Sequence, residues 1–567
     1  MEAAEEILPD EPRRAKKKWM TDEILKLMDQ RRAYKDENEE EKYKEIDKII
    51  KRECSKAKEN WLDMECKDIE KLKYRDTPTM YRKINMLTGK IRKKNNWAIN
   101  DKSGNLLIQE EETIKRWEEY TKELFDDNRG DKPYPNIEME GPKILKDEVR
   151  NAMKSMKRNK SPGNDNIKIE MLDALDDFGI DTLTALANKI YETGDIPEEM
   201  CKSIFIAIPK TPKAVDCDKH RIISLMSQMT KVLLRILLNR ARNKIKDKVS
   251  EVQYGFRPGK GTRNAMFIVR MMAERAIEMQ KDLYLCFVDY EKAFDKVHHL
   301  EMIKLLEEIS LDSKDIRIIT NLYWKNKAAL RVGNELTDWM EIKRGVRQGC
   351  VWSPDLFALY GEKIMENIQD EEGVIIGGRN INNIRYADDT VLIADSEEKL
   401  QRLLSKLSLA SKEKGLSINL KKTKVLVASR NENPPVCNLT LENDDTTFKI
   451  KQVQEFEYLG SFITADVRSD REIKKRIGLA KTSFNNMKTF LANRKLDLGI
   501  RKQVMKTYIW SKMLYGCESW TLSKEMERRL EAAEMWMYRR MLRTSWKDFK
   551  TNEEILRIAK TRREITE

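Results

Sequence analysis

The sequence predicts an α+β fold in which short strands are flanked by long helical ends. Two apolar stretches, Ile204–Ile208 and Leu283–Val288, have the length and residue types of buried strands. A third region holds two β-prone arms, 381–384 and 390–394, around a tight turn, which is typical of a hairpin. Residues 1–75 instead repeat apolar side chains at helical spacing among Glu, Lys and Arg, which predicts long amphipathic helices.

Length and composition are those of a globular intracellular protein. The 567 residues, 40% hydrophobic and 36% charged, suffice for three or four ordinary domains or for one large multi-lobed enzyme. The eight cysteines are widely spaced and include no CxxC pair, which indicates reduced thiols rather than disulfides. Cys217 and His220 have the spacing of half a zinc site, but no second half follows. No apolar run reaches the roughly 18 residues of a membrane span, so we expect a soluble nuclear or cytoplasmic protein without a membrane partner.

The positive charge is concentrated in two segments. The formal net charge is +13, which favours a polyanionic partner. Residues 401–430 hold eight Lys and Arg against one Glu, and residues 471–506 hold eleven against two acidic residues. We therefore expect two basic surfaces that follow the hairpin in the chain. The basic run Arg13–Lys18 fits a nuclear import signal, although such runs are more often solvated linkers.

Two adjacent carboxylates, Asp388 and Asp389, occupy the tip of the predicted hairpin. Like charges this close raise each other's pKa unless a cation lies between them. Asp289 follows directly after the strand Leu283–Val288 and is the natural partner for such a pair. Carboxylates from two strands can hold two divalent ions that clamp the attacking and leaving oxygens of a phosphoryl transfer, and an all-oxygen site suits Mg²⁺. From these residues alone, a nucleotidyl transferase, a nuclease and an ordinary solvated turn all remain open.

A glycine-rich segment, Tyr254–Thr262, alternates glycine with Arg and Lys. Such a segment lets a backbone approach phosphate groups closely, although an ordinary turn has the same composition. Further short motifs surround it, and their order along the chain is informative: Ile208-Pro209-Lys210, His220–Leu225, Gln253–Thr262, Asp289–Asp295, Gly345–Cys350 with Ser353-Pro354, Tyr386–Asp389, Gly415–Asn419 with Lys422-Thr423, and Tyr458-Leu459-Gly460.

With these eight motifs in order, the sequence resembles the reverse transcriptases of non-LTR (LINE-type) retrotransposons over about residues 203–460, and more weakly outside that range. The resemblance implies a right-hand polymerase with fingers, palm and thumb, whose antiparallel palm sheet carries the Tyr-Ala-Asp-Asp hairpin. It implies a charged helical N-terminal extension at 1–100, a segment leading into the fingers at 101–200, fingers and palm at 201–463, and a basic helical thumb and C-terminal region at 464–567. Such elements carry an upstream endonuclease domain, which the charged helices of the first hundred residues do not match, so we expect either an element fragment or a truncated gene model.

The resemblance also implies roles for individual residues around the metal ions. Asp289 and Asp388 would bind two Mg²⁺ ions, with Mn²⁺ as a substitute. Asp389 would lie beside them, and the Tyr290 backbone carbonyl would complete one oxygen shell. The remaining roles concern the nucleotide and its leaving group: Lys210 and Arg221 would hold the triphosphate, Phe294 would exclude a 2′-hydroxyl unless it is merely a core aromatic, and Lys422, or alternatively Lys424, would protonate the pyrophosphate.

A further group would contact the nucleic acid strands. Gln348 and Gly349 would lie against the nascent base pair and template, and Tyr386 would pack beside the primer end. The segment Tyr458-Leu459-Gly460 would grip the primer strand. The basic residues 471–506 would bind a duplex backbone. The implied partners are an RNA template, a DNA primer or target, and deoxynucleoside triphosphates.

The sequence therefore predicts an RNA-directed DNA polymerase that extends a primer 3′-hydroxyl by two-metal nucleotidyl transfer. The alternative from another class is a catalytically inactive, retroelement-derived RNA- and DNA-binding remnant. A two-metal nuclease is a third, less favoured interpretation. Three positions depart from the family pattern, namely Trp352, Asn264 and Ala358. We expect Trp352 to matter most, because a larger side chain beside Gln348 would crowd the template path.

Overall fold

The computed structural model describes residues 19–36, 39–72, 98–134, 141–212, 214–443, 446–494 and 496–566, together with single residues 76, 79, 80, 83 and 86. The basic run Arg13–Lys18 lies outside these residues. The chain divides into two compact units, one of residues 95–468 and the other of residues 1–94 together with 469–567. The predicted division into a segment at 101–200 and fingers and palm at 201–463 stays a prediction.

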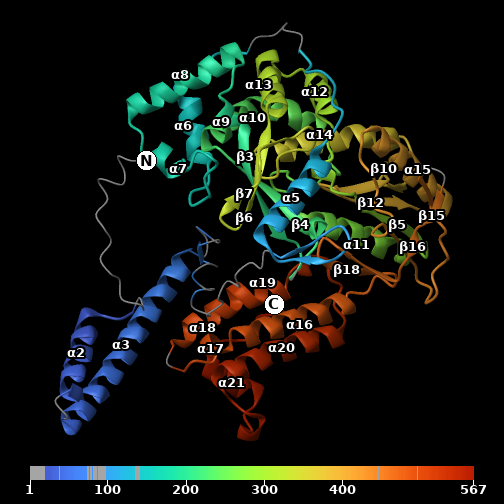
Figure 1. Cartoon of the computed structure of the whole chain (residues 1–567). Coiled ribbons are helices and arrows are strands. Elements are labelled where there is room, and N and C mark those ends of the chain that lie inside the picture. The colour runs from blue at the N-terminus through green and yellow to red at the C-terminus, as the bar shows by residue number, and fades with distance from the viewer. Residues whose placement is uncertain are drawn as a thin grey trace. The chain divides into compact units, whose positions relative to one another are not determined.

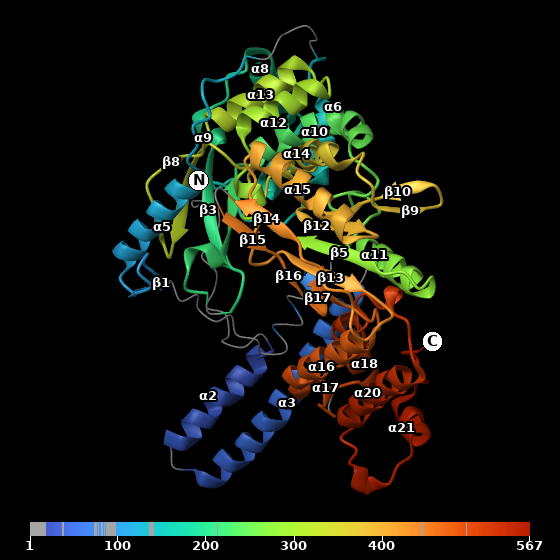
Figure 2. The ribbon, with the colours of Figure 1, turned by 90° about the vertical axis from the view of Figure 1, so that its right-hand side faces the viewer.

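The central sheet of the 95–468 unit has the strand order β11-β12-β5-β13-β16. The first four strands pair antiparallel, and β16 pairs parallel with β13. This sheet confirms the predicted strand Leu283–Val288, which is its central strand β5, and the predicted hairpin, whose strands β11 and β12 lie on one side of it. Strand β12 lies beside β5 (Figure 2). The strand bounds are β5 Leu283–Val288, β11 Asn383–Tyr386, β12 Asp389–Ala394, β13 Lys424–Ala428 and β16 Lys451–Gln452.

A second sheet has the order β4-β3-β6-β7, with β8 also paired to β6. The predicted strand Ile204–Ile208 lies within it and is longer by a few residues at its N-terminal end. Strands β3 and β4 pair antiparallel, so that Ile208 faces Arg221 across the ladder. The bounds are β3 Lys202–Pro209, β4 His220–Met226, β6 Lys327–Val332, β7 Glu335–Leu336 and β8 Met340–Glu341.

Four two-stranded hairpins complete the described strands of this unit. They are β1 Ile99–Asn100 with β2 Leu106–Leu107, β9 Val374–Ile376 with β10 Arg379–Ile381, β14 Thr440–Asn443 with β15 Thr446–Lys449, and β17 Glu455–Tyr458 with β18 Ser461–Thr464. The last pair contains the predicted primer-strand segment at its turn.

Helices pack on both sheets and enclose a large apolar core (Figure 1). Buried side chains of the central sheet, such as Leu392 and Val425, meet Leu233 and Leu237 of α10 and Leu403 of α15 in this core. The helices are α5 Glu110–Phe125, α6 Lys146–Ser155, α7 Ile169–Asp173, α8 Asp177–Thr193, α9 Glu198–Cys201, α10 Gln228–Lys248, α11 Thr262–Glu278, α12 His299–Glu308, α13 Ser313–Trp324, α14 Ser353–Met365 and α15 Glu397–Glu413, with 3₁₀ turns η1 Cys217–Lys219, η2 Ala293–Asp295 and η3 Glu366–Ile368.

The second unit is helical. Helices α2 and α3 form a hairpin in which the Arg31 guanidinium lies 2.6 Å from the Asp47 carboxylate. Ile69 of α3 shares an apolar core with Phe484 and Tyr538 from the C-terminal helices. The elements are α2 Asp22–Asp36, α3 Glu40–Leu72, α16 Asp470–Asn486, α17 Lys488–Leu491, α18 Leu498–Met505, the π-helical turn η4 Lys506–Trp510, α19 Ser511–Met513, η5 Cys517–Ser519, α20 Lys524–Leu542, η6 Trp546–Asp548 and α21 Asn552–Ala559.

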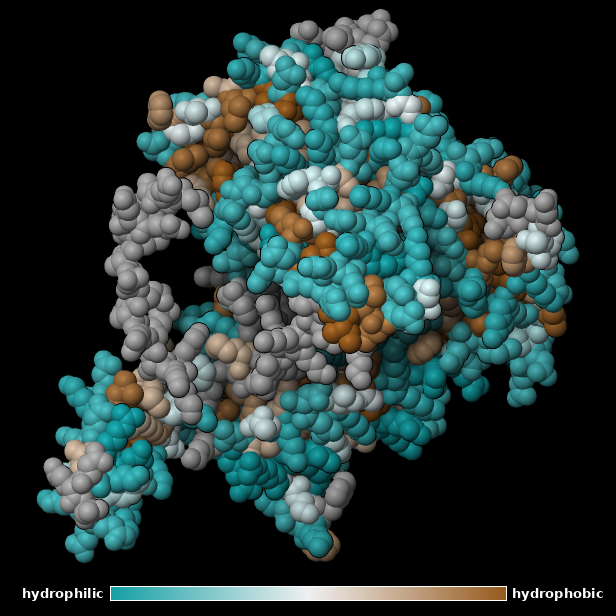
Figure 3. Space-filling view, in the orientation of Figure 1, coloured by the Kyte–Doolittle hydropathy of each residue, from teal (hydrophilic) through white to brown (hydrophobic). Residues whose placement is uncertain are grey.

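The visible surface is largely hydrophilic (Figure 3). Hydrophobic side chains are exposed near α7 and α8, where Phe178 is 79% and Met171 49% accessible. Within the described residues, no helix has a stretch that is both long and apolar enough to cross a membrane.

Candidate active site

The Asp-Asp turn is the two-residue loop of the β11–β12 hairpin. Tyr386 pairs with Asp389 across the ladder, which leaves Ala387 and Asp388 as the turn residues. Strand β12 in turn pairs with β5 so that Thr390 faces Val288. One further step along this register brings Asp389 alongside Asp289. At one end of its strands, the sheet therefore brings Asp289 close to Asp388 and Asp389, although about a hundred residues separate Asp289 from this pair in the sequence.

The three carboxylates influence one another's ionisation. Burial, reinforced by the negative charge of Asp289, raises the pKa of Asp388. Burial also raises the pKa of Asp389 to about 7, and the charges of Asp388 and Asp289 add to that effect. Lys422 acts in the opposite direction, and its Nζ lies 3.2 Å from Asp289 Oδ2. The site is thus a partly exposed cluster of negative charge that a cation stabilises.

Asp289 is held by the loop that carries Lys422. The Asp289 backbone N–H donates to Thr423 Oγ1 at 3.3 Å, and its carbonyl accepts from Asn419 N–H at 2.7 Å. These bonds fix the 419–423 loop against the end of β5. Lys424 lies on β13 instead, where its Nζ donates to the backbone carbonyls of Lys421 and Thr423.

The carboxylates open into a cavity of about 1110 Å³. Eleven of the predicted site residues line it: Lys210, Arg221, Asp289, Tyr290, Phe294, Gln348, Gly349, Tyr386, Asp388, Asp389 and Lys422. An adjoining cavity of about 440 Å³ shares Asp289, Asp389 and Lys422, and Tyr458 and Leu459 also line it. Gly460 lines neither cavity; with φ +86° it forms the turn between β17 and β18.

The carboxylate oxygens of these aspartates are the atoms that could bind divalent cations. Asp289 Oδ2 is buried, and the Lys422 ammonium group lies 3.2 Å from it, so this oxygen already faces a cationic group. Carboxylate oxygen is the ligand that hard divalent ions prefer. Across the described ranges, no three Asp, Glu, His or Cys side chains are already gathered as a ligand set. The chemistry of the carboxylates of Asp289, Asp388 and Asp389 therefore fits hard divalent ions.

Cationic side chains lie at the end of the second sheet. Ile208 pairs with Arg221 across the β3–β4 ladder. Just beyond this pair, the Lys210 N–H donates to the Lys219 carbonyl. Lys210 and Arg221 therefore lie at the same end of the two paired strands. Lys292 lines the same cavity although sequence reasoning did not single it out. Its backbone has φ +51°, and burial lowers its pKa. Lys292 lies within the Asp289–Asp295 motif, and this position in the sequence could have identified it as a candidate site residue.

Phe294 stands in an aromatic stack. Its ring lies 4.1 Å, centroid to centroid, from Phe357 of α14 at an interplanar angle of 22°. Phe256 meets the other side edge-on at 6.1 Å. The ring is only half-buried and lines the cavity, so it is held by the core and also exposed to a bound molecule.

Gln348 and Gly349 lie where a loop meets strand β4. The Gln348 carbonyl accepts from Ser224 N–H at 2.7 Å, and its side-chain Nε2 donates to Asp295 Oδ1 at 2.9 Å. Gly349 has φ +117°, and a Cβ there would lie 2.8 Å from the Ser224 carbonyl oxygen. Only glycine allows this approach. Asp295, which orients the Gln348 amide, is another residue that sequence reasoning missed.

The expectation for Trp352 was wrong. Its ring is 1% exposed, and Nε1 donates to the Leu234 carbonyl of α10 at 2.7 Å. The side chain therefore points into the core and does not line the catalytic cavity. Asn264 accepts from Gly261 N–H at 2.9 Å and so caps α11, and Ala358 is buried on α14. None of the three departures enters the cavity.

The two basic segments have different structures. Residues 401–430 form α15 and the loop to β13, whereas residues 471–506 form α16 to α18 of the helical unit. Arg471, Lys474 and Lys488 are exposed on that unit. Arg476 is instead buried and paired with Glu472, so part of the charge is structural.

Residues 208–463 match the family described as reverse transcriptase (RNA-dependent DNA polymerase). Among curated proteins, the chain is 28% identical over 284 residues to a retrovirus-related Pol polyprotein from a type-1 R2 retrotransposable element of Nasonia vitripennis, covering 49% of this chain and 27% of that protein. It is 25% identical to the RNA-directed DNA polymerase from the mobile element jockey of Drosophila melanogaster, over 66% of this chain and 41% of the relative. For the jockey polymerase of Drosophila funebris, identity is 25% over 74% and 47%. The chain thus spans less than half of the length of each of these three relatives.

Proposed function

We propose that this chain acts as the RNA-directed DNA polymerase of a non-LTR retrotransposon, because residues 208–463 match the reverse transcriptase family. It extends the 3′-hydroxyl of a DNA primer or target on an RNA template with deoxynucleoside triphosphates, in the nucleus or cytoplasm. The observation that supports this proposal best is the meeting of Asp289, Asp388 and Asp389 in one cavity with cations. Such an arrangement suits a reaction in which negative charge develops on phosphate.

In this proposal Asp289 and Asp388 would hold two Mg²⁺ ions, with Mn²⁺ as a substitute, the Tyr290 carbonyl as a further oxygen ligand and Asp389 in support. Such ions would supply positive charge for the primer hydroxyl and for the leaving oxygen. Their binding also favours the ionised form of Asp389, whose pKa is raised to about 7 by burial and its neighbours. The requirement for divalent cations is a general property of reverse transcriptases; the choice of Mg²⁺ belongs to the proposal.

The chain's own cations handle the triphosphate. Lys210 and Arg221 leave the same end of the β3–β4 ladder and bind the phosphates. Lys422, which lies 3.2 Å from Asp289 Oδ2, donates a proton to the departing pyrophosphate. The Phe294 ring, backed by Phe357, excludes a nucleotide that carries a 2′-hydroxyl.

The remaining residues position the two strands. Gln348 and Gly349 lie against the nascent base pair and template, and Tyr386 packs beside the primer end. The turn Tyr458-Leu459-Gly460 grips the primer strand next to the adjoining cavity. The exposed cations of α16 and α17 bind the duplex backbone and make its affinity fall with salt.

Primer extension on an RNA template tests this function. The wild-type chain is tested with Mg²⁺ and deoxynucleotides beside Asp388→Asn and the matched control Asp395→Asn. Asp388 directly precedes strand β12, and Asp395 is an exposed aspartate that directly follows it. We expect extension by the wild type and the control and its loss in Asp388→Asn by about three orders of magnitude. A wild-type chain that binds an RNA–DNA duplex in a salt-dependent manner but extends nothing would instead be the inactive remnant.

A further inference from the structure

The turn that presents Asp388 contains an unusual backbone conformation. Ala387 has φ +59°, in the left-handed region where a Cβ is normally disfavoured. A two-residue hairpin loop with such an angle usually carries Gly, Asn or Asp at that position. Something outside the hairpin must therefore hold Ala387 in place.

The side-chain amide of Gln253 binds both sides of Ala387. Its Oε1 accepts from Ala387 N–H at 2.9 Å, and its Nε2 donates to the Ala387 carbonyl at 3.4 Å. The same Oε1 accepts from Gly255 N–H at 2.8 Å. Gln253 is 1% exposed. Since one rigid amide contacts the peptide groups before and after Ala387, it restrains both backbone dihedrals of the turn.

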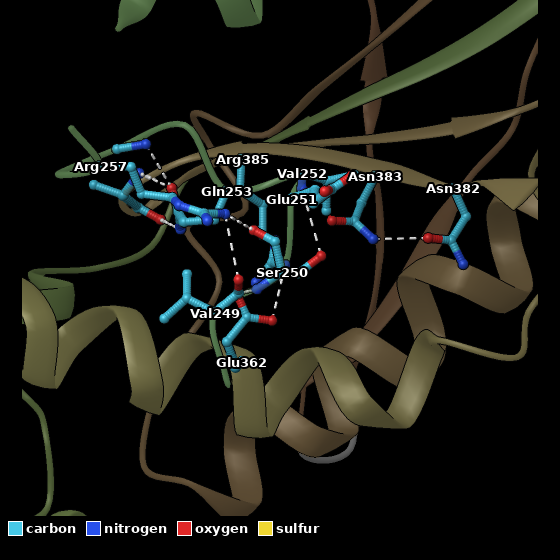
Figure 4. Close-up of polar contacts among 12 residues, drawn as sticks. Val249, Ser250, Glu251, Val252, Gln253, Arg257, Glu362, Asn382, Asn383 and Arg385 are labelled. Atoms are coloured by element: carbon cyan, nitrogen blue, oxygen red, sulfur yellow. Dashed lines mark hydrogen bonds and ion pairs between the residues drawn. The ribbon is translucent and has the colours of Figure 1, made fainter. Parts of the chain in front are cut away.

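Residues 249–257, here called the strap, carry Gln253 to the hairpin. Tyr254 N–H donates to the Arg385 carbonyl at 2.8 Å, and Arg385 N–H donates to the Val252 carbonyl at 3.0 Å, so the strap runs beside β11 as a parallel bridge (Figure 4). At Gly255, a Cβ would lie 2.3 Å from the Ala387 nitrogen. Glycine is thus required for the strap to reach the turn.

A buried ion pair fixes the strap and the hairpin to the same helix. Arg385 Nη2 lies 3.0 Å from Glu362 Oε2 of α14, with side chains 3% and 14% exposed. Glu362 Oε1 accepts from Ser250 N–H at 3.1 Å, and Arg257 Nη1 donates to the Ser250 carbonyl at 2.7 Å (Figure 4). One carboxylate therefore joins β11 to the start of the strap.

We propose that Gln253 is a positioning residue for the reaction proposed above. It lies among neither the metal ligands nor the residues that line the cavity. It holds Ala387 in the left-handed conformation, and this conformation directs Asp388 into the cavity that Asp289 also lines. The inference rests on the proposed function only for the role of Asp388 in catalysis. The hydrogen bonds between Gln253 and Ala387 are independent of that function.

Gln253→Met removes the amide while keeping the length of the side chain. The matched control is Gln401→Met, because the Gln401 amide binds Thr440 N–H and the Thr440 carbonyl of β14 in the same way, both at 2.8 Å, without lining either cavity. For Gln253→Met we expect kcat to fall about tenfold or more while KM for the deoxynucleotide stays within about twofold. We also expect Mn²⁺ to bind about tenfold more weakly in a direct titration of the protein without substrates.

Hydrogen exchange and a second site separate positioning from folding. Exchange of the peptide that contains the Ala387 amide should quicken in Gln253→Met and stay unchanged in Gln401→Met. Adding Ala387→Gly to Gln253→Met should restore part of the kcat and of the Mn²⁺ affinity, because glycine adopts φ +59° without help. If Gln253→Met does not fold, Ala387→Val provides a second test. This variant keeps the Gln253 amide, but its β-branched side chain disfavours the positive φ at position 387, so it should lower kcat as well.

Three results would overturn the inference. They are wild-type kcat and Mn²⁺ affinity in Gln253→Met, a loss of equal size in Gln401→Met, or wild-type kcat in Ala387→Val. Failure of the proposed function gives a different pattern. In that case the wild type extends no primer, yet Mn²⁺ binding is weakened by Asp388→Asn and by Gln253→Met alike, which leaves the positioning role supported.

Discussion

The ammonium group of Lys422 lies 3.2 Å from Oδ2 of Asp289, whereas Lys424, two residues later, directs its ammonium group at the carbonyls of its own loop. Both lysines follow the Gly415–Asn419 motif closely, and they differ in the atoms that their ammonium groups contact. This difference is the reason why the proposal assigns the proton donor to Lys422.

Lys422→Met should therefore lower the rate of nucleotide addition by about 10²-fold, which is the usual size of a lost general acid. The physical reason is the loss of a proton donor and of the cation that offsets Asp289. Single-turnover primer extension across a range of pH gives the measurement. Lys424→Met serves as the control and should stay within about threefold of the wild type. Equal losses in the two variants would contradict the assignment.

Phe294→Ala should raise the use of ribonucleotides relative to deoxynucleotides by about tenfold or more, since removing a ring opens space for the 2′-hydroxyl. Phe357→Ala should shift selectivity in the same direction but by a smaller factor. This variant keeps the Phe294 ring and removes the Phe357 ring that stacks against it. Selectivity is measured as the ratio of kcat/KM for matched nucleotides.

The control for this series is Phe448→Ala, which removes a partly exposed ring from β15. It should not change the ratio. Unchanged selectivity in Phe294→Ala would return Phe294 to an ordinary packing role.

Asp295 makes stability depend on pH. Burial raises its pKa to about 6, against the opposing hydrogen bond from Gln348 and the positive charge of Lys292. A raised folded-state pKa adds stability that is fully present below the unfolded value near 3.8 and is lost as pH rises through about 6. At pH 8 the wild type therefore bears the cost of a buried charge.

Asp295→Asn should stabilise the folded chain at pH 8 by up to roughly 3 kcal/mol, and the gain should vanish near pH 4. The asparagine oxygen can still accept from Gln348, so the loop contact is retained. Urea unfolding at the two pH values measures the effect. Asp395→Asn, at an exposed position, should show no such pH-dependent gain, and a gain of equal size there would contradict the argument.

Trp352→Leu should lower stability without lowering catalysis. The smaller side chain leaves a cavity beside Leu234 and removes the donor to its carbonyl, which together cost about 3 kcal/mol. Thermal unfolding measures the loss, and kcat per folded molecule measured well below the transition should stay unchanged. A higher kcat in the variant would mean that the indole ring does obstruct the template after all.

Local pattern was sufficient to predict the elements that carry the site. The strand Leu283–Val288 is confirmed at the predicted bounds because a continuous apolar run flanked by charged residues has few other solutions. The hairpin is confirmed because β-prone arms flank a polar turn. The motif residues Lys210, Arg221, Gln348 and Lys422 line one cavity, as the resemblance implied, although their individual roles remain predictions.

The sequence by itself determined which residues are present for phosphoryl chemistry and which segments form strands and helices, because those properties follow from residue type and short-range periodicity. Only the tertiary structure decided where side chains point. It turned Trp352 into the core, brought Lys422 rather than Lys424 to Asp289, and placed the Gln253 amide on Ala387, 134 residues away. The direction of a side chain depends on which distant backbone packs against it, and that information appears in no local stretch of the chain.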